Sequence, residues 1–239
     1  MNIKGILQNA AAALGYRIVP NNRDCASSYR WLRSIPFKTI VDVGAHNGAT
    51  VSKWLEDFPS AFVHAFEPLP SAFKALEQVA AASSGRAKAW NYAASDSSGT
   101  MKFFEHTDHL SSSSAFRATD VSKSVLSFTR NEREIVVPSA TLDQLLFEQH
   151  AGMETPMLVK LDVQGMEAAV VRGSPRLFDM ARVVLAEVSV IPLYEGQCTF
   201  ADLYTLLGQH GFDYRGVVEQ FHLSDGTPVY FDALFTKKN

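Results

Sequence analysis

Short apolar runs alternate with helix-like segments along most of this chain. In residues 48–58, Val51, Trp54, Leu55 and Phe58 recur at the spacing of one helical face. We expect strands in 39–44, 61–68, 87–95, 157–165 and 182–189, and helices in 48–58, 71–82, 140–149, 166–178 and 199–212, with Ser71 as the cap of the second helix and Gly211 as the end of the last. This alternation predicts an α/β fold, a mostly parallel sheet with helices on both faces.

Two pairs of strand-like segments depart from the alternation. Residues 212–218 and 228–238 follow each other without a helix, so we expect them to pair as an antiparallel edge of the sheet. Residues 97–106 and 133–138 are expected to pair as extra strands. The serine-rich segment 109–116 between them has no strand or helix pattern and is expected to be a loop.

The domain organisation is simple. Residues 1–38 are interpreted as an N-terminal helical cap or extension, and residues 39–239 as one domain. The extension could support a homodimer. No stretch approaches the roughly 18 apolar residues that a membrane-spanning helix needs.

Charge and cysteine content narrow the function classes. The net charge is −3, from 22 Lys and Arg against 25 Asp and Glu, without a basic run, which argues against a nucleic-acid partner. Cys25 and Cys198 are far apart and form no CxxC motif. A reducing, cytoplasmic location is therefore expected, and a disulfide or a metal site is not.

The candidate chemistry begins in the stretch TIVDVGAHNGAT, residues 39–50. Asp42 interrupts an apolar strand just before Gly44 and Gly48, and Glu67 ends the next strand. Ligands of such sheets bind beyond the carboxyl ends of the strands, where an acid can hold the hydroxyls of a ribose. The spacing lacks the G-x-G-x-x-G of a nicotinamide site, and Asp42 suits the ammonium of S-adenosylmethionine. The alternatives are that Asp42 caps its own loop and that Glu67 is a solvated strand end.

Several motifs in order resemble the FkbM family of S-adenosylmethionine-dependent methyltransferases. They are VDVGAHNGA, AFEPLPSAFKAL, NYAASDSSG, SSSSAF, VPSATLDQL, LVKLDVQGMEAAVVRG, LAEVSVIPLYEGQ and FDALF, within residues 14–236. The resemblance implies a class I methyltransferase (Rossmann-like) fold, seven strands with the last one antiparallel. It also implies O-methylation, frequently of a sugar hydroxyl in a glycolipid, polysaccharide or natural product. The chain departs from the family's usual residues at His46, where Asn is common, and at Gln164, where Glu is common and where Gln cannot act as a base.

The residues expected to contact S-adenosylmethionine are Asp42, Gly44, Ala45, His46, Gly48, Glu67, Pro68, Ala94, Ser95, Asp96 and Asp162. Glu67 would take the ribose. Asp96 would accept a hydrogen bond from the adenine amino group, or would only form the turn with Gly99.

Three residues are candidates for removing the proton of an acceptor hydroxyl: Asp162, Glu187 and His46. Asp162 follows a strand and would orient the acceptor or take its proton, or alternatively cap the helix that starts near Met166. Glu187 lies in an apolar strand, where a carboxylate is either paired or close to the cleft. His46 would meet the cofactor or act as a base, or face solvent. Glu167 is interpreted as a first-turn acid that complements the helix dipole.

The acceptor, a small molecule or a glycan or glycolipid, is expected to contact Ser112, Ser113, Tyr194 and Glu195. Tyr194 would offer a stacking face, or pack in the interior. Two other functions stay open from the sequence: a nicotinamide-dependent oxidoreductase and a nucleotide-binding protein without catalysis. The chain lacks the Tyr-x-x-x-Lys pair common in nicotinamide-dependent oxidoreductases of this size, which counts against the first.

Overall fold

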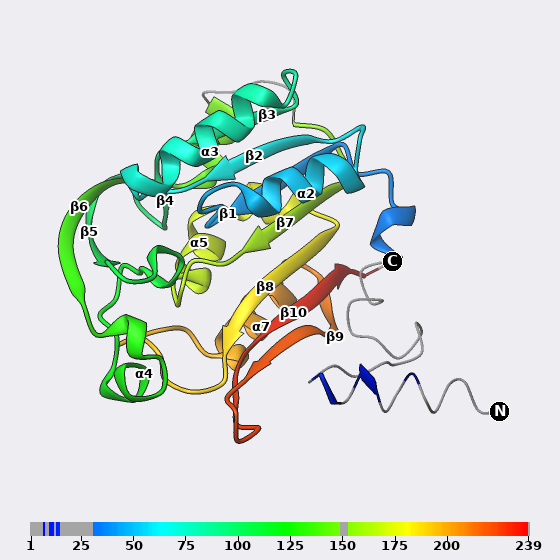
Figure 1. Ribbon diagram of the computed structural model, residues 1–239. Coiled ribbons are helices and arrows are strands. Elements are labelled where there is room, and N and C mark those ends of the chain that lie inside the picture. The colour runs from blue at the N-terminus through cyan, green and yellow to red at the C-terminus, as the bar shows by residue number, and fades with distance from the viewer. Residues whose placement is uncertain (1–6, 8–9, 12, 15–30, 149–152, 239) are drawn as a thin grey trace.

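The computed structural model describes residues 7, 10–11, 13–14, 31–148 and 153–238, and a seven-stranded sheet forms its centre (Figure 1). The strand order is β3 (Ala87–Trp90), β2 (Phe62–Phe66), β1 (Thr39–Val43), β7 (Met157–Leu161), β8 (Val183–Ser189), β10 (Pro228–Lys237) and β9 (Phe212–His222). β10 lies between β8 and β9 and is antiparallel to both, whereas β1 is parallel to β2 and β7. The predicted class I methyltransferase fold is confirmed.

The strand order reverses beside β1. From β1 the chain moves outward to β2 and β3, and it later returns to the other side of β1 as β7. Val43 at the end of β1 is in register with Leu161 at the end of β7, so the two following loops leave the sheet side by side. Ligands of open α/β sheets bind beyond the strand ends at such a switch point.

Helices cover both faces of the sheet, as predicted. α2 (Ala49–Asp57) and α3 (Pro70–Ala82) pack on one face, and α5 (Glu167–Gly173), α6 (Pro175–Met180) and α7 (Phe200–Gln209) pack on the other. β1 supplies both layers, because Ile40 contacts the α2 side and Val41 the α5 side. All five residues of β1 are buried, which explains its nearly continuous apolar run.

Two predicted helices have irregular forms. The helix predicted over 166–178 is divided into α5 and α6 by Ser174 and Pro175, at the Gly-Ser-Pro signal. In the helix predicted over 140–149, Gln144–Glu148 adopt the wider π form, and residue 149 lies outside the described residues.

A three-stranded sheet of β4 (Ala93–Ala94), β6 (Glu132–Ala140) and β5 (Gly99–His106) flanks the main sheet. β5 and β6 are antiparallel, which confirms the predicted extra pair. The single strand predicted over 87–95 is wrong, because the segment is divided into β3 in the main sheet and β4 beside β6. The predicted cap at Ser71 is also wrong: α3 begins at Pro70, and the Ser71 hydroxyl donates to Glu105 instead.

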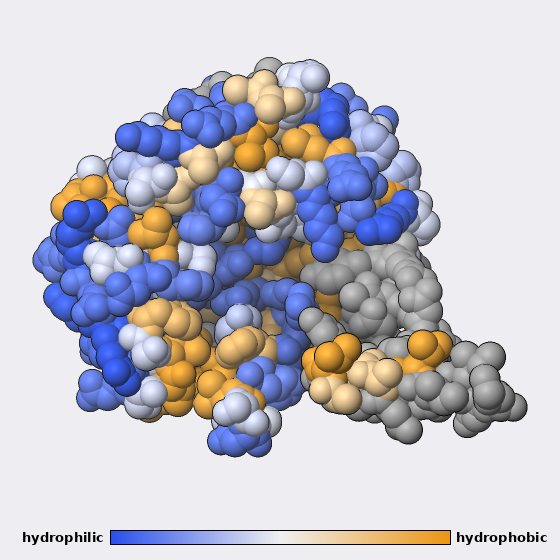
Figure 2. Space-filling model, viewed as in Figure 1, coloured by the Kyte–Doolittle hydropathy of each residue, from blue (hydrophilic) through white to orange (hydrophobic). Residues whose placement is uncertain are grey.

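The chain between β5 and β6 contains the serine-rich segment and α4 (Asp120–Val125). Leu110–Ser112 form one 3-10 turn and Ser127–Thr129 another. Apolar side chains gather on the lower part of the surface in Figure 2, around α4. Beneath them a small buried cluster joins Leu126, Leu193, Tyr194 and Val229.

The described residues just before β1 pack into the core of the main sheet. Leu32–Ser34 form a 3-10 turn, and Leu32, Ile35 and Phe37 are buried in the layer on the α2 side. Most of the predicted cap over 1–38 lies outside the described residues, as does Cys25. Within the described ranges, no helix is long and apolar enough to cross a membrane.

Candidate active site

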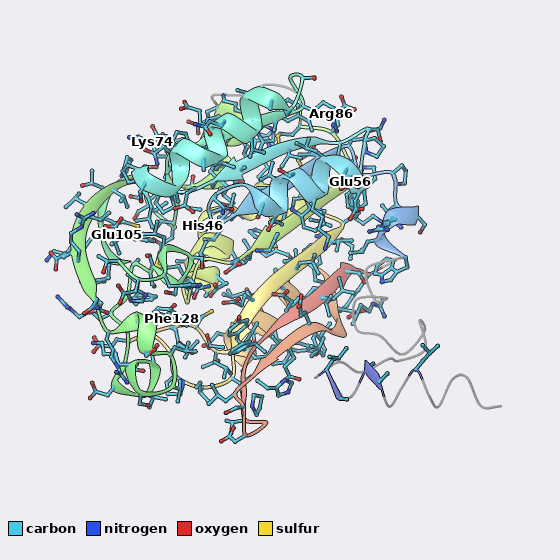
Figure 3. All side chains as sticks on the ribbon, viewed as in Figure 1. His46, Glu56, Lys74, Arg86, Glu105 and Phe128 are labelled. Carbon is cyan, nitrogen blue, oxygen red and sulfur yellow. The ribbon has the colours of Figure 1, made fainter. Side chains whose placement is uncertain are left out.

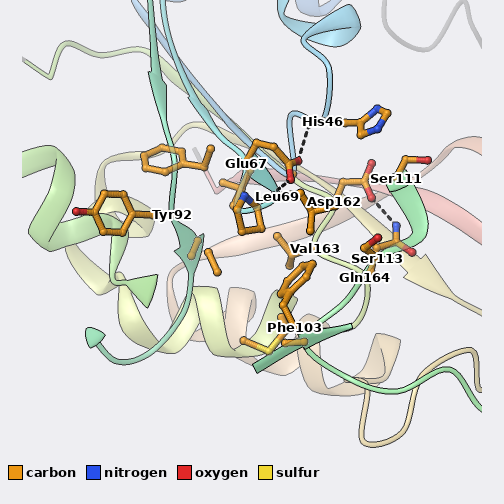
Figure 4. Close-up of a pocket in the computed structure, with 18 of the residues that line it drawn as sticks. His46, Glu67, Leu69, Tyr92, Phe103, Ser111, Ser113, Asp162, Val163 and Gln164 are labelled. Carbon is orange, nitrogen blue, oxygen red and sulfur yellow. Dashed lines mark hydrogen bonds between the residues drawn. The ribbon is translucent and has the colours of Figure 1, made fainter. Parts of the chain in front are cut away.

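A pocket lies at the carboxyl ends of β1, β2 and β7, where the strand order reverses (Figure 4). Its polar lining includes His46, Glu67, Ser111, Ser113 and Asp162. Its apolar lining comes from both sheets and the serine-rich loop, and includes Phe66, Leu69, Tyr92, Met101, Phe103, Leu110, Val163 and Met166. The pocket therefore offers carboxylates and hydroxyls beside an apolar wall, as a nucleoside ligand requires.

Gly44 permits the close approach of the two loops at the pocket floor. The amide of Asp162 donates to the Val43 carbonyl at 2.9 Å, which holds the two loops together. A Cβ on Gly44 would lie 1.9 Å from the carbonyl oxygen of Asp162, and the Gly44 φ of +87° is one that side chains disfavour. Only glycine fits this position without a shift of the backbone.

Glu67 shapes the loop after β1 from the neighbouring strand. Its Oε2 accepts from the His46 amide at 2.9 Å, and its Oε1 accepts from the Leu69 amide at 2.8 Å (Figure 4). The side chain lines the pocket but is only 5% exposed. Burial raises the pKa of Glu67 to about 7, although the two amides favour the ionised form. Each carboxylate oxygen still has a lone pair for a ligand hydroxyl.

His46 lies at the rim of the pocket, beyond the end of α2 opposite Glu56 (Figure 3). Its φ of 47° is unusual for a residue with a side chain. Its backbone amide is used by Glu67, and its ring extends away from that carboxylate (Figure 4). Burial and the neighbouring His109 lower the pKa of His46, so the neutral ring predominates at pH 7.

Asp162 presents a carboxylate to the pocket with both oxygens oriented. Lys160 Nζ donates to Oδ2 at 2.8 Å, and Gln164 Nε2 donates to Oδ1 at 2.7 Å. The side chain keeps 28% of its surface exposed. The alternative that Asp162 caps a helix is wrong, because α5 has Met166 at its N-cap and no side-chain cap there.

Glu187 does not line the pocket. Its Oε1 accepts from the same Gln164 nitrogen at 2.8 Å. Burial raises the pKa of Glu187 well above its usual value, and the charges of Asp162 and Asp232 raise it further.

The predicted site residues fall into two groups. Those that line the pocket are Gly44, His46, Glu67, Pro68, Ala94, Ser113 and Asp162. Those that do not are Asp42, Ala45, Gly48, Ser95, Asp96, Ser112, Glu187, Tyr194 and Glu195.

Among the second group, the expected stacking face of Tyr194 is absent because that residue is interior. Tyr194 is 2% exposed, and its hydroxyl lies 2.7 Å from the Ser112 carbonyl and 2.6 Å from Gln164 Oε1. Glu195 and Asp96 are exposed and lie away from the pocket lining. Ser112 is held by His106, whose Nδ1 lies 2.8 Å from its hydroxyl.

Two acids serve the interior rather than the pocket. Asp42 is fully buried, and its Oδ2 accepts from the Trp54 indole at 3.1 Å. Among the described residues the Asp42 Oδ1 has no hydrogen-bond partner, and burial raises the pKa of Asp42. Glu167 is buried as well, and its Oε1 accepts from the amides of Val163 and Gly165. Glu167 lies in the first turn of α5, as predicted, and through these two amides it also organises the loop before the helix.

Sequence reasoning missed the apolar wall and Gln164 among the residues of this site. Tyr92, Met101 and Phe103 come from the flanking sheet, whose place beside the pocket has no local signal. Gln164 has a φ of 54°, and the Q-G pair at 164–165 was the available signal for a tight turn beside the site.

The pocket fits S-adenosylmethionine on features of the chain itself. That cofactor has a purine, a ribose, an ammonium and a sulfonium, and the pocket presents an apolar wall, Glu67 and Asp162. Gly44 lines the pocket where the loops after β1 and β7 meet.

Comparison with known proteins agrees with this fit. A family model described as the methyltransferase FkbM domain matches residues 42–214, well over half of the chain. The 2-O-methyltransferase NoeI of Sinorhizobium fredii is 28% identical over 178 residues, 72% of this chain and 72% of that protein.

Two solved methyltransferase structures are similar to this chain at low identity. The 1,6-didemethyltoxoflavin-N1-methyltransferase of Burkholderia thailandensis, solved with S-adenosylhomocysteine, has a TM-score of 0.48 and 12% identity, over 92% of this chain and 79% of that one. The precorrin-6y C5,15-methyltransferase of Geobacter metallireducens has a TM-score of 0.47 and 11% identity, over 90% and 87%. The family match decides the identity: the chain belongs to the FkbM methyltransferase family and is an S-adenosylmethionine-dependent methyltransferase.

Proposed function

We propose that this protein transfers the methyl group of S-adenosylmethionine to a hydroxyl oxygen, in a sugar of a glycan, glycolipid or natural product. The observation that carries the proposal is the Asp162 carboxylate, which lines the pocket with both oxygens oriented. The 2-O-methyltransferase relative supports an oxygen acceptor. Family membership decides against the nicotinamide-dependent oxidoreductase considered from the sequence.

Glu67 and the loop after β1 would hold the nucleoside. The free lone pairs of Glu67 would accept from the ribose hydroxyls, and the apolar wall around Phe103 would face the purine. Because the Glu67 carboxylate also receives the His46 amide, ribose binding and the shape of this loop would be coupled.

When bound, the cofactor supplies a methyl carbon already activated by a positive sulfur. A hydroxyl is a poor nucleophile at neutral pH, so a nearby base aids the transfer. Asp162 would orient the acceptor hydroxyl and take its proton. The acceptor oxygen forms the new O–C bond while the C–S bond breaks and its electron pair stays on sulfur. Alignment and exclusion of water account for the remaining acceleration.

The acceptor would enter past His46 and the serine-rich loop. Ser111 and Ser113 line the pocket from that loop and could bond to sugar hydroxyls. Because Tyr194 is interior and Glu195 lies outside the lining, we assign neither to direct acceptor contact. The cytoplasmic location and the homodimer stay predictions from the sequence.

The test is methyl transfer to a panel of glycans, glycolipids and hydroxylated small molecules, read by mass spectrometry. We expect one acceptor class to gain a methyl group, and we expect Asp162→Asn to lower kcat by about 10²- to 10⁴-fold with unchanged S-adenosylhomocysteine affinity. Asp120→Asn on the exposed end of α4 is the matched control and should behave as wild type.

Near-normal turnover by Asp162→Asn would remove Asp162 as the base. Tight binding of S-adenosylhomocysteine without transfer to any hydroxyl acceptor would instead favour the noncatalytic alternative or a different acceptor atom.

A further inference from the structure

Gln164 joins the two acids of the site through a single nitrogen. Its Nε2 donates to Asp162 Oδ1 at 2.7 Å and to Glu187 Oε1 at 2.8 Å. A side-chain amide has two N–H bonds on one nitrogen, so it can serve both carboxylates at once. The opposite orientation would place the amide oxygen against two carboxylate oxygens, so these neighbours fix which way the amide points.

The other end of the same amide is held by Tyr194. The phenol oxygen lies 2.6 Å from Gln164 Oε1 and 2.7 Å from the carbonyl of Ser112, so its one proton is shared between two acceptors. The Tyr194 side chain is only 2% exposed. The amide is thus fixed at both its oxygen and its nitrogen.

Gln164 also contacts the loop that lines the pocket. The hydroxyl of Ser114, which is fully buried, donates to the Gln164 carbonyl at 2.7 Å. Ser113, the preceding residue, lines the pocket, and Ser112 receives the Tyr194 hydroxyl. The serine-rich loop is therefore bound to the same residue that orients Asp162.

From these contacts we propose that Gln164 is a positioning residue, which fixes Asp162 for reaction through Tyr194 and Glu187 and couples that carboxylate to the serine-rich loop. This inference rests on the proposed function, because it assigns a role to Gln164 in the same proton removal. Gln164 neither gives nor takes a proton. An amide at this position supplies donors to both acids, whereas a carboxyl group would add a third acid between them.

The charges around Asp162 come from every neighbouring element. They are Lys160 on β7, Asp42 on β1, His46 after β1, Glu67 after β2, Glu187 on β8 and Asp232 on β10, with the phenols of Tyr194 and Tyr230. Gln164 is the neutral member that touches both Asp162 and Glu187. Replacing it with a carboxyl group would place a further acid against both, and close like charges disfavour ionisation, so we expect that variant to need a higher pH for activity.

The experiment compares Gln164→Met, Gln164→Glu, Tyr194→Phe and the Gln164→Met, Tyr194→Phe double variant with wild type. We expect Gln164→Met to lower kcat by about 10- to 100-fold, the cost of a carboxylate that is no longer held in place, while S-adenosylhomocysteine affinity stays within about twofold. We expect Gln164→Glu to move the acid limb of the kcat/KM profile to higher pH by about one unit. Gln78→Glu on the exposed face of α3 makes the same charge change away from the site and should leave the profile in place.

Tyr194→Phe keeps the ring and removes only the hydroxyl, so it tests the inference even if the Gln164 variants fail to fold. We expect it to lower kcat, and we expect the double variant to lose no more than Gln164→Met alone, because both act through one amide. The positioning role would be overturned if folded Gln164→Glu had the same kcat and the same pH profile as the wild-type protein. Fully additive losses of kcat in the double variant would also overturn it. Absence of transfer by the wild-type protein would instead refute the proposed function, and this inference with it.

Discussion

We predict that the buried carboxyl group of Glu67 makes cofactor affinity depend on pH. Its pKa is raised to about 7 from an ordinary 4.5, mainly because the side chain is only 5% exposed. With a pKa near 7, about one tenth of the protein is ionised at Glu67 at pH 6, and about nine tenths at pH 8. If the ribose hydroxyls donate to the ionised carboxylate, S-adenosylhomocysteine should bind about tenfold more tightly at pH 8 than at pH 6.

The same shift acts on stability with a defined sign. Since the folded pKa lies above the unfolded one, the contribution of the protonated group is fully present below pH 4.5 and is lost as pH rises through 7. A difference of this size corresponds to roughly 3 kcal/mol of unfolding free energy. The protein without ligand should therefore lose stability through this group between pH 5 and 8, and S-adenosylhomocysteine should restore more stability at pH 8 than at pH 6.

Calorimetric titration with S-adenosylhomocysteine at pH 6, 7 and 8 measures the affinity, and thermal unfolding at the same pH values measures the stability. Glu67→Gln is the matched control, because its side chain does not titrate. The effect of Glu67 is the pH dependence of the wild-type protein minus that of this variant. Asp232, whose pKa is raised to about 6, titrates in both and cancels in that difference. An affinity that is level from pH 6 to 8, or equally steep in Glu67→Gln, would refute the assignment of the ribose to Glu67.

Two further predictions concern the support of the site. Gly44→Ala should lose about 2 kcal/mol or more of unfolding free energy and at least tenfold in S-adenosylhomocysteine affinity, because its Cβ would lie 1.9 Å from the Asp162 carbonyl. Gly85→Ala is the control, because Gly85 has a similar φ of +79° but a Cβ there would meet nothing within 4 Å. Equal losses of unfolding free energy for the two variants in urea titrations would contradict the contact argument. Trp54→Phe should cost about 1–3 kcal/mol of unfolding free energy, because buried Asp42 loses the indole that donates to its Oδ2. Trp31→Phe, at a position 42% exposed, is the control in the same urea titration, and a loss as large as that of Trp54→Phe would refute this account.

Much of the main sheet was predictable because its patterns are local. β1 is buried throughout and reads as an apolar run, and α2 buries the face on which its apolar residues recur. In both elements the sequence pattern matches the observed burial. The absence of a helix between β9 and β10 was enough to predict their antiparallel pairing. What the pattern did not contain was the break between β3 and β4, where Asn91 donates to the carbonyls of Glu67 and Pro68 and the chain leaves the main sheet.

The site was predictable at the strand ends and less so in the loops. Gly44, Glu67 and Asp162 follow directly from the rule that ligands bind beyond parallel strands, and all three line the pocket. Tyr194 carries a side chain suited to a sugar, yet the fold uses it inside to hold Gln164. Side-chain type alone cannot separate these uses, because the difference lies in contacts between segments far apart in the chain.

The charged residues within the strands show why such contacts matter. Asp42 on β1 is in register with Lys160 on β7, and Glu187 on β8 is in register with Asp232 on β10. Burial alone would lower the pKa of Lys160, but the charges of Asp162, Asp42 and Asp232 raise it instead. Within the described part of the chain, Lys160 is the one cation that acts on Asp42, Glu187 and Asp232 together.

Each of these acids would be costly in an apolar strand if it stood alone. Considered alone along the sequence, Glu187 is a candidate for a base and Asp42 a candidate for a contact to the cofactor. The strand register gathers them around one lysine, and it leaves more carboxylates than positive charges beside the pocket. Asp162 lines the pocket, whereas Asp42, Glu187 and Asp232 do not, so Asp162 is the one of these acids that we expect a substrate to reach.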